Sequence, residues 1–196
     1  ERGAYRLEDP VSKYLPEFAG PPKDTEPKTS PTPAGNLSQA PVVAVTPPTW
    51  DANDKSKITI RQLLTHFSGL KPDFNLGEKW FGYGEAIRRL KIETLQSPPG
   101  TKFVYSDLNY IALGDIVHKL SGTALDAFAR TNIFEPLGMQ DTSFNPDAAH
   151  RKRAAPTEKR ASTEAYLGGK ETPTANDRII QGEVHDPTAW RMGGVA

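Results

Sequence analysis

Two side chains that could take part in chemistry, Tyr105 and Asp107, lie close together in residues 98–110, which read PPGTKFVYSDLNY. The Pro-Gly pair predicts a turn and the following apolar spacing predicts an amphipathic helix, so Tyr105 should lie on the tight connection between them. A free phenol has a pKa of about 10 and is a poor base at neutral pH, unless nearby cations favour the phenolate or its proton moves in a concerted step. The residues alone leave two interpretations open: Tyr105 is a reactive phenol, or it is an aromatic side chain that packs at the start of a helix.

Asp107 also has two interpretations. At the first turn of a helix, a carboxylate can cap free backbone N–H groups and is favoured by the helix dipole. Facing a substrate, a carboxylate accepts hydrogen bonds but donates none unless it is protonated, whereas an amide does both. The two roles are compatible with each other, and the cap is the simpler one.

Ser68 and Lys71 form the one Ser-x-x-Lys pair of the chain. On a helix this spacing brings a hydroxyl and an ammonium group to one face, where the serine could become an activated nucleophile. Gly69 lies between them and Pro72 follows directly, and both disfavour a helix here. We therefore predict that this pair is not a nucleophile motif. His66 lies two residues from Ser68, on a different helix face, and is predicted to be structural.

The composition excludes several functional classes. The 196 residues hold 24 Lys and Arg against 24 Asp and Glu, so there is no basic excess for a nucleic-acid partner, and no apolar run is long enough to cross a bilayer. The absence of cysteine excludes disulfides and thiolate catalysis. The histidines lack ligand spacing, so we predict no metal site. They are His66, His118 (expected on the outer, solvated face of its helix), and His150 and His185, which are both expected in loops. Asp186 follows His185, but no nucleophile accompanies this pair. No cofactor is predicted either.

The chain divides into four predicted segments: residues 1–18, which lead in, a Pro-rich insertion loop over 19–57, a helical region with the tyrosine motif over 58–145, and a loop-rich segment over 146–196. Eight prolines lie between Gly20 and Pro48. Such a segment buries too little apolar surface to offset its ordering entropy, so we expect a surface loop, with a short strand or an anchor at residues 42–45. A lid over a substrate is the alternative.

The helical region has clear boundaries in the sequence. Thr59 and Gln62 have capping-box spacing for a helix through His66, which Gly69 would close. Further helices are expected over 84–95 and 108–121, the second ended by Gly122, and Thr123 with Asp126 should cap the next one. The apolar spacing predicts a core of Leu113, Ile116, Val117, Leu120, Phe128 and Ile133.

Several phrases together resemble the serine β-lactamase and penicillin-binding-protein superfamily, in the branch of class C β-lactamases, D-amino-acid peptidases and β-lactamase-like esterases. They are LEDPVSKYLPEF at 7–18, TIRQLLTHFSGL at 59–70, PPGTKFVYSDLNY at 98–110, PLGM at 136–139 and GEVHDP at 182–187. The resemblance implies an α+β fold of which this chain is the helix-rich middle portion, with long Pro-rich loops.

The family mechanism is acyl transfer, in which a serine attacks a carbonyl, a lysine one helical turn later assists, and a tyrosine from a second motif shuttles the proton. The resemblance assigns that shuttle to Tyr105 and a substrate-binding position to Asp107. Many family members have asparagine at the latter position, which leaves esterase or peptidase activity as open as β-lactam hydrolysis. The serine motif and the third motif, Lys-Thr-Gly or His-x-Gly, are not found, because Lys170-Glu171-Thr172 lacks the glycine.

Two functional hypotheses follow, and whether the chain is itself an enzyme stays open between them. The first is a portion of a serine hydrolase that is inactive alone, with small ester, amide or peptide substrates and the remainder of its own polypeptide as partners. The second is a non-catalytic binding module derived from the hydrolase fold. The resemblance implies a periplasmic or cell-envelope location.

Overall fold

The computed structural model describes residues 3–20, 50–160 and 178–194. Its first elements are two short 3₁₀ helices, η1 (Val11–Lys13) and η2 (Pro16–Ala19), followed by α1 (Ile60–Leu64), α2 (Tyr83–Ile92) and α3 (Asp107–Ser121). The remaining elements are α4 (Leu125–Ala129), the π-helix η4 (Arg130–Phe134), α5 (Ala148–Arg153), β1 (Pro156–Arg160), β2 (Arg178–Gln181) and α7 (Pro187–Arg191). The chain is therefore helix-rich α+β, as predicted.

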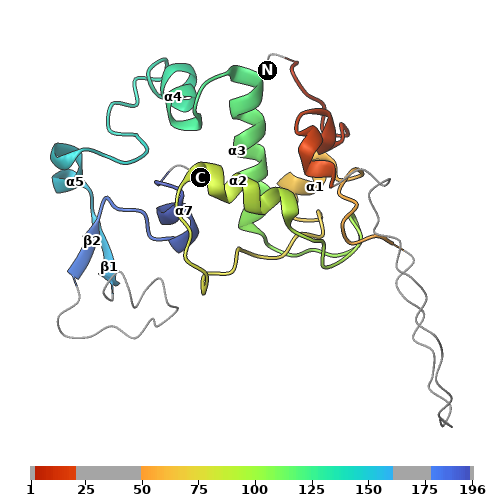
Figure 1. Ribbon diagram of the computed structural model, residues 1–196. Coiled ribbons are helices and arrows are strands. Elements are labelled where there is room, and N and C mark those ends of the chain that lie inside the picture. The colour runs from red at the N-terminus through yellow and green to blue at the C-terminus, as the bar shows by residue number, and fades with distance from the viewer. Residues whose placement is uncertain (1–2, 21–49, 161–177, 195–196) are drawn as a thin grey trace, which may run out of the picture.

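Helix α3 runs through the middle of the helical body and contacts α1, α2 and α4 (Figure 1). It ends as predicted at Gly122, whose φ of 68° is left-handed and whose N–H donates to the His118 carbonyl at 2.8 Å. Its N-cap is Ser106, and Asp107 is the first helical residue. Asp107 is thus one position too late for the predicted cap, although its charge still lies at the positive end of the helix dipole.

The capping box at the start of α1 is confirmed. The Gln62 N–H donates to the Thr59 hydroxyl at 3.2 Å, and the Gln62 side-chain carbonyl accepts from the Thr59 N–H at 3.0 Å. The helix is shorter than predicted, because Leu64 is its last residue and His66 already adopts a left-handed φ of 59°. Helix α2 likewise begins one residue and ends three residues before its predicted limits.

The core lies between the N-terminal segment, α1, α2 and the first half of α3. Its buried members include Val11, Leu15, Phe18, Ile58, Ile60, Leu63, Leu90, Leu108, Ile111 and Ile116. The predicted core was partly wrong: Ile116 is buried and Leu113 packs half-buried against it, but Leu120 and Ile133 are 44% and 45% exposed. The predicted apolar face of α3 is shifted by about one residue from the face that is buried in the structure. The reason is that the buried face includes Asp115, which accepts a hydrogen bond from the Tyr83 hydroxyl at 2.8 Å.

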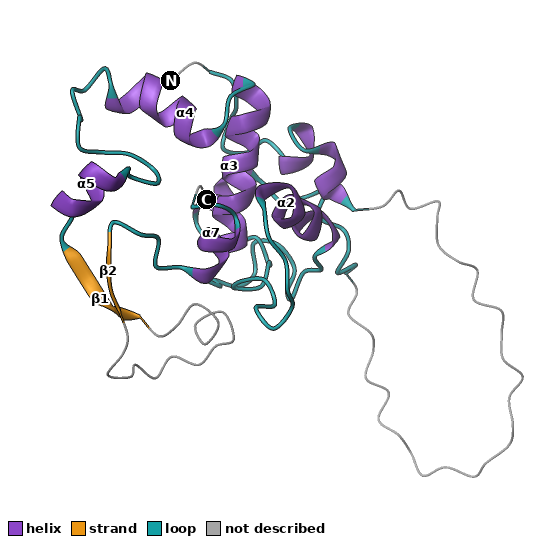
Figure 2. Ribbon diagram, turned by 60° about the vertical axis from the view of Figure 1, so that its left-hand side comes forward, coloured by secondary structure: helices purple, strands orange, loops and turns teal. Residues whose placement is uncertain are grey.

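The segment after α3 also departs from prediction. Ala124, not Thr123, is the N-cap of α4, and the Thr123 hydroxyl donates to the Ser121 carbonyl at 3.3 Å. Helix α5 and the β1–β2 hairpin lie apart from the helical body, on the left of Figure 1, and Figure 2 gives the same arrangement. The two strands are antiparallel, with a register shift between Pro156 and Lys159. The segment over 146–196, predicted to be loop-rich, therefore contains two helices and both strands, while residues 161–177 lie outside the described residues.

The lead-in segment is attached to α1 through a short antiparallel bridge between Pro10 and Thr59, and the Val11 N–H donates to the Ile58 carbonyl at 2.8 Å. The predicted Pro-rich loop, with its strand at 42–45, falls largely on residues 21–49, outside the described residues. Within the described ranges, each helix is too short or too polar to cross a bilayer.

A buried lysine closes the C-terminal end of α2. Lys55 is 1% exposed, and its ammonium group donates to the carbonyl oxygens of Leu90, Lys91 and Glu93 at 3.3, 2.6 and 2.7 Å. It also lies 5.0 Å from the centre of the Phe18 ring. Burial lowers the pKa of Lys55 to about 8, while the Glu93 charge acts in the opposite direction. The ammonium form therefore still predominates at neutral pH and satisfies carbonyl groups that the helix leaves free.

Replacing this lysine with an apolar residue of similar length should destabilise the fold. Lys55→Met leaves buried carbonyl oxygens without a donor, so we expect the free energy of unfolding to fall by about 3 kcal/mol in urea denaturation. Lys57→Met, at an exposed position two residues on, serves as the control and should change it by less than about 0.5 kcal/mol. Equal stability of the two variants would contradict this role of Lys55.

Candidate active site

The turn that carries Tyr105 is attached to the segment 66–72 by hydrogen bonds on both sides of the tyrosine. Before Tyr105, the Gly100 N–H donates to the Phe67 carbonyl at 2.7 Å and the Val104 N–H donates to the His66 carbonyl at 2.9 Å. After Tyr105, the Ser106 hydroxyl donates to the Lys71 carbonyl at 2.6 Å and the Asp107 N–H donates to the Pro72 carbonyl at 2.8 Å. These bonds fix the backbone next to Tyr105, whereas its side chain is 63% exposed. The phenol is therefore presented to solvent from a fixed backbone position.

Ser68 and Lys71, the Ser-x-x-Lys pair of the sequence, have separate partners. Ser68 is 1% exposed, and its hydroxyl donates to the Asn109 side-chain carbonyl at 2.6 Å and accepts from the Leu70 N–H at 3.1 Å. The Lys71 ammonium instead pairs with the Glu93 carboxylate at 2.7 Å. A buried hydroxyl with both partners in place is poorly suited to attack a substrate, which agrees with the prediction that this pair is no nucleophile motif.

The histidines occupy different surroundings. His66 lies beside the tyrosine turn, with its ring centre 4.6 Å from that of Tyr105. His118, expected to be solvated, is half-buried against the edge of the Tyr83 ring. His150 is in α5 and pairs with Asp147 at 2.8 Å rather than lying in a loop. Lys170-Glu171-Thr172, which lacks the glycine of the third family motif, lies outside the described residues.

The charge nearest Tyr105 is negative. Asp107 raises the pKa of the Tyr105 phenol, chiefly through its charge and also as a hydrogen-bond acceptor. Burial and the Asp186 charge in turn raise the pKa of Asp107, which the hydrogen bond from the Tyr105 hydroxyl counteracts. This local field favours the neutral phenol, which is the opposite of what a tyrosine base requires.

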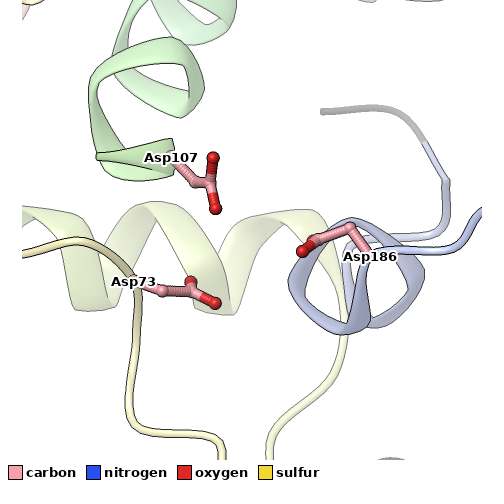
Figure 3. Close-up of side chains that lie close together, drawn as sticks. All are labelled: Asp73, Asp107 and Asp186. Carbon is pink, nitrogen blue, oxygen red and sulfur yellow. The ribbon is translucent and has the colours of Figure 1, made fainter. Parts of the chain in front are cut away.

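Asp107 belongs to an acidic cluster of three residues that come from distant parts of the sequence (Figure 3). Asp107 starts α3, Asp73 lies in the loop before α2, and Asp186 is the N-cap of α7, accepting from the Ala189 N–H at 2.7 Å. One carboxylate oxygen of each lies within 4.8 Å of the others. Burial, and then the charges of its two neighbours, raise the pKa of Asp73, although the Thr188 hydroxyl at 2.7 Å lowers it.

The cluster has oxygen donors of the type that Mg²⁺ and Ca²⁺ accept, and carboxylates also pair with organic cations. Beside it lies a cavity of about 150 Å³, lined by Asp107, Tyr110, Ile111, Asp186, Thr188 and Ala189. Sequence patterns do not indicate this cluster, because Asp73 has no motif around it and Asp186 follows His185 in a phrase without an accompanying nucleophile. The approach of α7 to the start of α3 is a tertiary contact that no local pattern indicates.

The sequence profile of the Beta-lactamase family matches residues 1–181 of the chain. A Salmonella agona protein named "Putative D-alanyl-D-alanine carboxypeptidase" is 29% identical over 204 residues, which cover 99% of this chain and 41% of that protein. A Salmonella typhimurium protein of the same name gives the same identity and coverage. The chain thus spans about 41% of the length of these relatives.

Solved structures show the same fold. A β-lactamase/D-alanine carboxypeptidase from Yersinia pestis, complexed with citrate, has a TM-score of 0.55 and 23% identity, covering 96% of this chain and 45% of its own. FmtA from Staphylococcus aureus has a TM-score of 0.58 and 19% identity, covering 98% and 40%. A class C β-lactamase has a TM-score of 0.60 and 17% identity, covering 97% and 40%.

Removing the charge of Asp107 should lower the pKa of Tyr105. In Asp107→Asn the amide keeps the shape of the side chain but not its negative charge, so the phenol should titrate closer to about 10. An NMR pH titration with ring-labelled tyrosine measures this, and Tyr105→Phe identifies the signal. Asp126→Asn, at the start of α4, is the control, and an unchanged Tyr105 pKa in Asp107→Asn would contradict the assignment.

The acidic cluster should reduce stability at neutral pH. A carboxyl whose pKa is raised by folding stabilises the folded state only while it is protonated, and this contribution is lost as the pH rises through its folded pKa. Asp186→Asn removes one charge and keeps the oxygen that caps α7, so we expect about 1 kcal/mol more stability at pH 7. The gain should vanish in acid, where Asp73 and Asp107 are protonated.

Asp186→Ala provides the matched comparison. It removes the charge and the cap together, so it should be about 1 kcal/mol less stable than Asp186→Asn. Urea denaturation at pH 7 and at acid pH measures both variants. If Asp186→Asn were less stable than the original protein at pH 7, repulsion within the cluster would be refuted.

Proposed function

The chain belongs to the β-lactamase family, and we propose that it forms the tyrosine-bearing wall of a serine hydrolase active site. The observation that carries this proposal is the exposed Tyr105 phenol on a hydrogen-bonded turn, beside Asp107, which itself lines the cavity. A residue that relays a proton needs this combination of a fixed backbone and an accessible hydroxyl.

In the proposed reaction, a serine hydroxyl attacks the carbonyl carbon of the substrate. The C–O bond to the serine forms, and the serine proton passes through the Tyr105 hydroxyl to the leaving amine or alcohol as its bond to the carbonyl breaks. Water then attacks the acyl-enzyme by the reverse relay, releasing the acid and restoring the serine. Each proton that Tyr105 accepts is passed on, so the phenol ends every half-reaction as it began.

The serine is proposed to belong to another part of the polypeptide. Ser68, in the one Ser-x-x-Lys pair of the sequence, is buried and bonded to Asn109. We therefore propose that the chain is inactive alone and that its partner is the remainder of its polypeptide, in the cell envelope. For substrates we propose small amides or peptides, since the named carboxypeptidase relatives suggest a D-alanyl peptide as the first to test, with esters as the alternative class.

A second candidate is a non-catalytic binding module. It is favoured by one observation: Asp107 raises the pKa of Tyr105, so the nearest charge works against a tyrosine base. In such a module the acidic cluster and cavity would hold a ligand and Tyr105 would only contact it.

Acylation separates these possibilities. Intact-mass analysis after incubation with a fluorophosphonate should show no adduct on residues 1–196. The longer polypeptide containing an upstream Ser-x-x-Lys should acquire one adduct, and Tyr105→Phe in it should slow acylation by about 10²-fold or more. Tyr5→Phe, in the exposed lead-in segment, is the control. An adduct on Ser68 of the shorter chain would overturn the proposal, and equal rates for Tyr105→Phe and Tyr5→Phe would favour the binding module.

A further inference from the structure

We infer that His66 is the positioning residue of the Tyr105 turn, which it holds through the Nδ1 atom of a neutral imidazole and through the faces of its ring. The catalytic meaning of this role rests on the proposed function of Tyr105, whereas the positioning concerns only contacts of the described residues.

The backbone of His66 is the first sign of a special role. Its φ of 59° is left-handed, which among the described non-glycine residues recurs only at Asn145. A side chain in this region costs about 1 kcal/mol or more, so it persists where its surroundings enforce it. Here the His66 N–H donates to the Leu63 carbonyl at 3.2 Å, and the His66 carbonyl accepts from the Val104 N–H at 2.9 Å. The left-handed residue thus follows the end of α1 and is bonded to the segment before Tyr105.

The ring nitrogen Nδ1 acts as an acceptor. The Ser106 backbone N–H, directly after Tyr105, reaches Nδ1 at 3.1 Å, and the Asn109 side-chain amide nitrogen reaches it at the same distance. A backbone N–H can only donate, so Nδ1 carries its one lone pair, which the two donors share, and the imidazole proton lies on Nε2. A protonated Nδ1 would face two donors, which makes the neutral ring part of the folded arrangement.

Buried neighbours fix the direction of every bond in this network. The Leu70 N–H donates to Ser68 Oγ, so the Ser68 hydroxyl proton is free for Asn109 Oδ1 at 2.6 Å. The amide of Asn109 must then turn its nitrogen toward His66. Ser68 and Asn109 are 1% and 0% exposed, so a wrong orientation would leave a buried group unsatisfied. The imidazole is held by a network with one consistent set of donors and acceptors.

The ring in turn contacts the exposed aromatic side chains of the site. Its centre lies 4.6 Å from that of Tyr105 at 33° and 5.4 Å from that of Tyr110 at 32°, and it meets Phe103 edge-on at 6.0 Å. Since Nδ1 fixes the plane of the imidazole, that plane limits where the Tyr105 phenol can lie. His66 thereby holds both the backbone after Tyr105 and the face of its ring.

Two substitutions separate the acceptor from the ring. His66→Asn places Oδ1 two bonds from Cβ, as Nδ1 is in histidine, and asparagine tolerates the left-handed region; it keeps the acceptor but loses the ring. His66→Gly also suits the backbone but keeps neither. By hydrogen-exchange NMR we expect the Ser106 N–H to exchange about 10-fold faster in His66→Gly, and within about 3-fold of the original rate in His66→Asn. The Ile116 N–H inside α3 reports any global loss of stability.

Asn145→Gly is the control, because it makes the same backbone change at the other left-handed residue. It should leave Ser106 exchange unchanged. An unaltered Ser106 rate relative to Ile116 in His66→Gly, or no difference between His66→Asn and His66→Gly, would overturn the inference. Should either variant fail to fold, ¹⁵N NMR of the unsubstituted protein decides: a proton on Nε2 supports the inference, and a proton on Nδ1 refutes it.

The effect of His66 on catalysis is measured in a separate acylation experiment. In the longer polypeptide, His66→Gly should lower the acylation rate about 10-fold with His66→Asn partly restoring it. If Tyr105→Phe has no effect there but the Ser106 result holds, the proposed function fails and the positioning role survives. If Tyr105→Phe slows acylation but Ser106 exchange is insensitive to His66, the reverse is true.

Discussion

The candidate site depends on a buried line of hydrogen bonds that joins two segments far apart in the sequence. It runs from Leu70 through Ser68 and Asn109 to His66, and ends at the Ser106 N–H beside Tyr105. Each bond is worth only about 1 kcal/mol net, but a buried polar group left without its partner costs about 1–3 kcal/mol. Breaking one of these hydrogen bonds therefore leaves the neighbouring groups without a partner. This cost keeps the two segments in one position relative to each other.

Buried polar groups also fix the surrounding helices. Lys55 joins the segment before α1 to the end of α2, and Asp115 accepts from Tyr83 across the α2–α3 contact. Arg191 donates to the carbonyl groups of Leu76 and Glu78, which ties α7 to the loop before α2. These contacts are directional, so they determine how the helices are rotated against one another in a way that apolar packing alone would not.

Local signals predicted the parts of the fold that depend on neighbouring residues. The capping box of Thr59 and Gln62 and the helix end at Gly122 were confirmed, because both are satisfied within a few residues. The apolar face of α3 was assigned about one position off, since Asp115 is polar in sequence yet buried in the fold. The acidic cluster could not be predicted from the sequence either, because only the tertiary approach of α7 brings Asp186 to Asp73 and Asp107. The catalytic assignment of Tyr105 stays a prediction that rests on family resemblance.

The residues around Tyr105 hold its side chain in position but do not activate its hydroxyl. The described contacts hold the phenol in place through His66 and the bonds from the turn to residues 66–72, yet the nearest charge, Asp107, favours its neutral form. Lowering the pKa of a phenol takes cations or hydrogen-bond donors close to the oxygen, because desolvation and carboxylates both act in the other direction. The residues around Tyr105 thus account for its geometry and not for a reactive phenolate. In a working hydrolase, the groups that supply positive charge would have to approach the exposed side of the ring, which this arrangement leaves open.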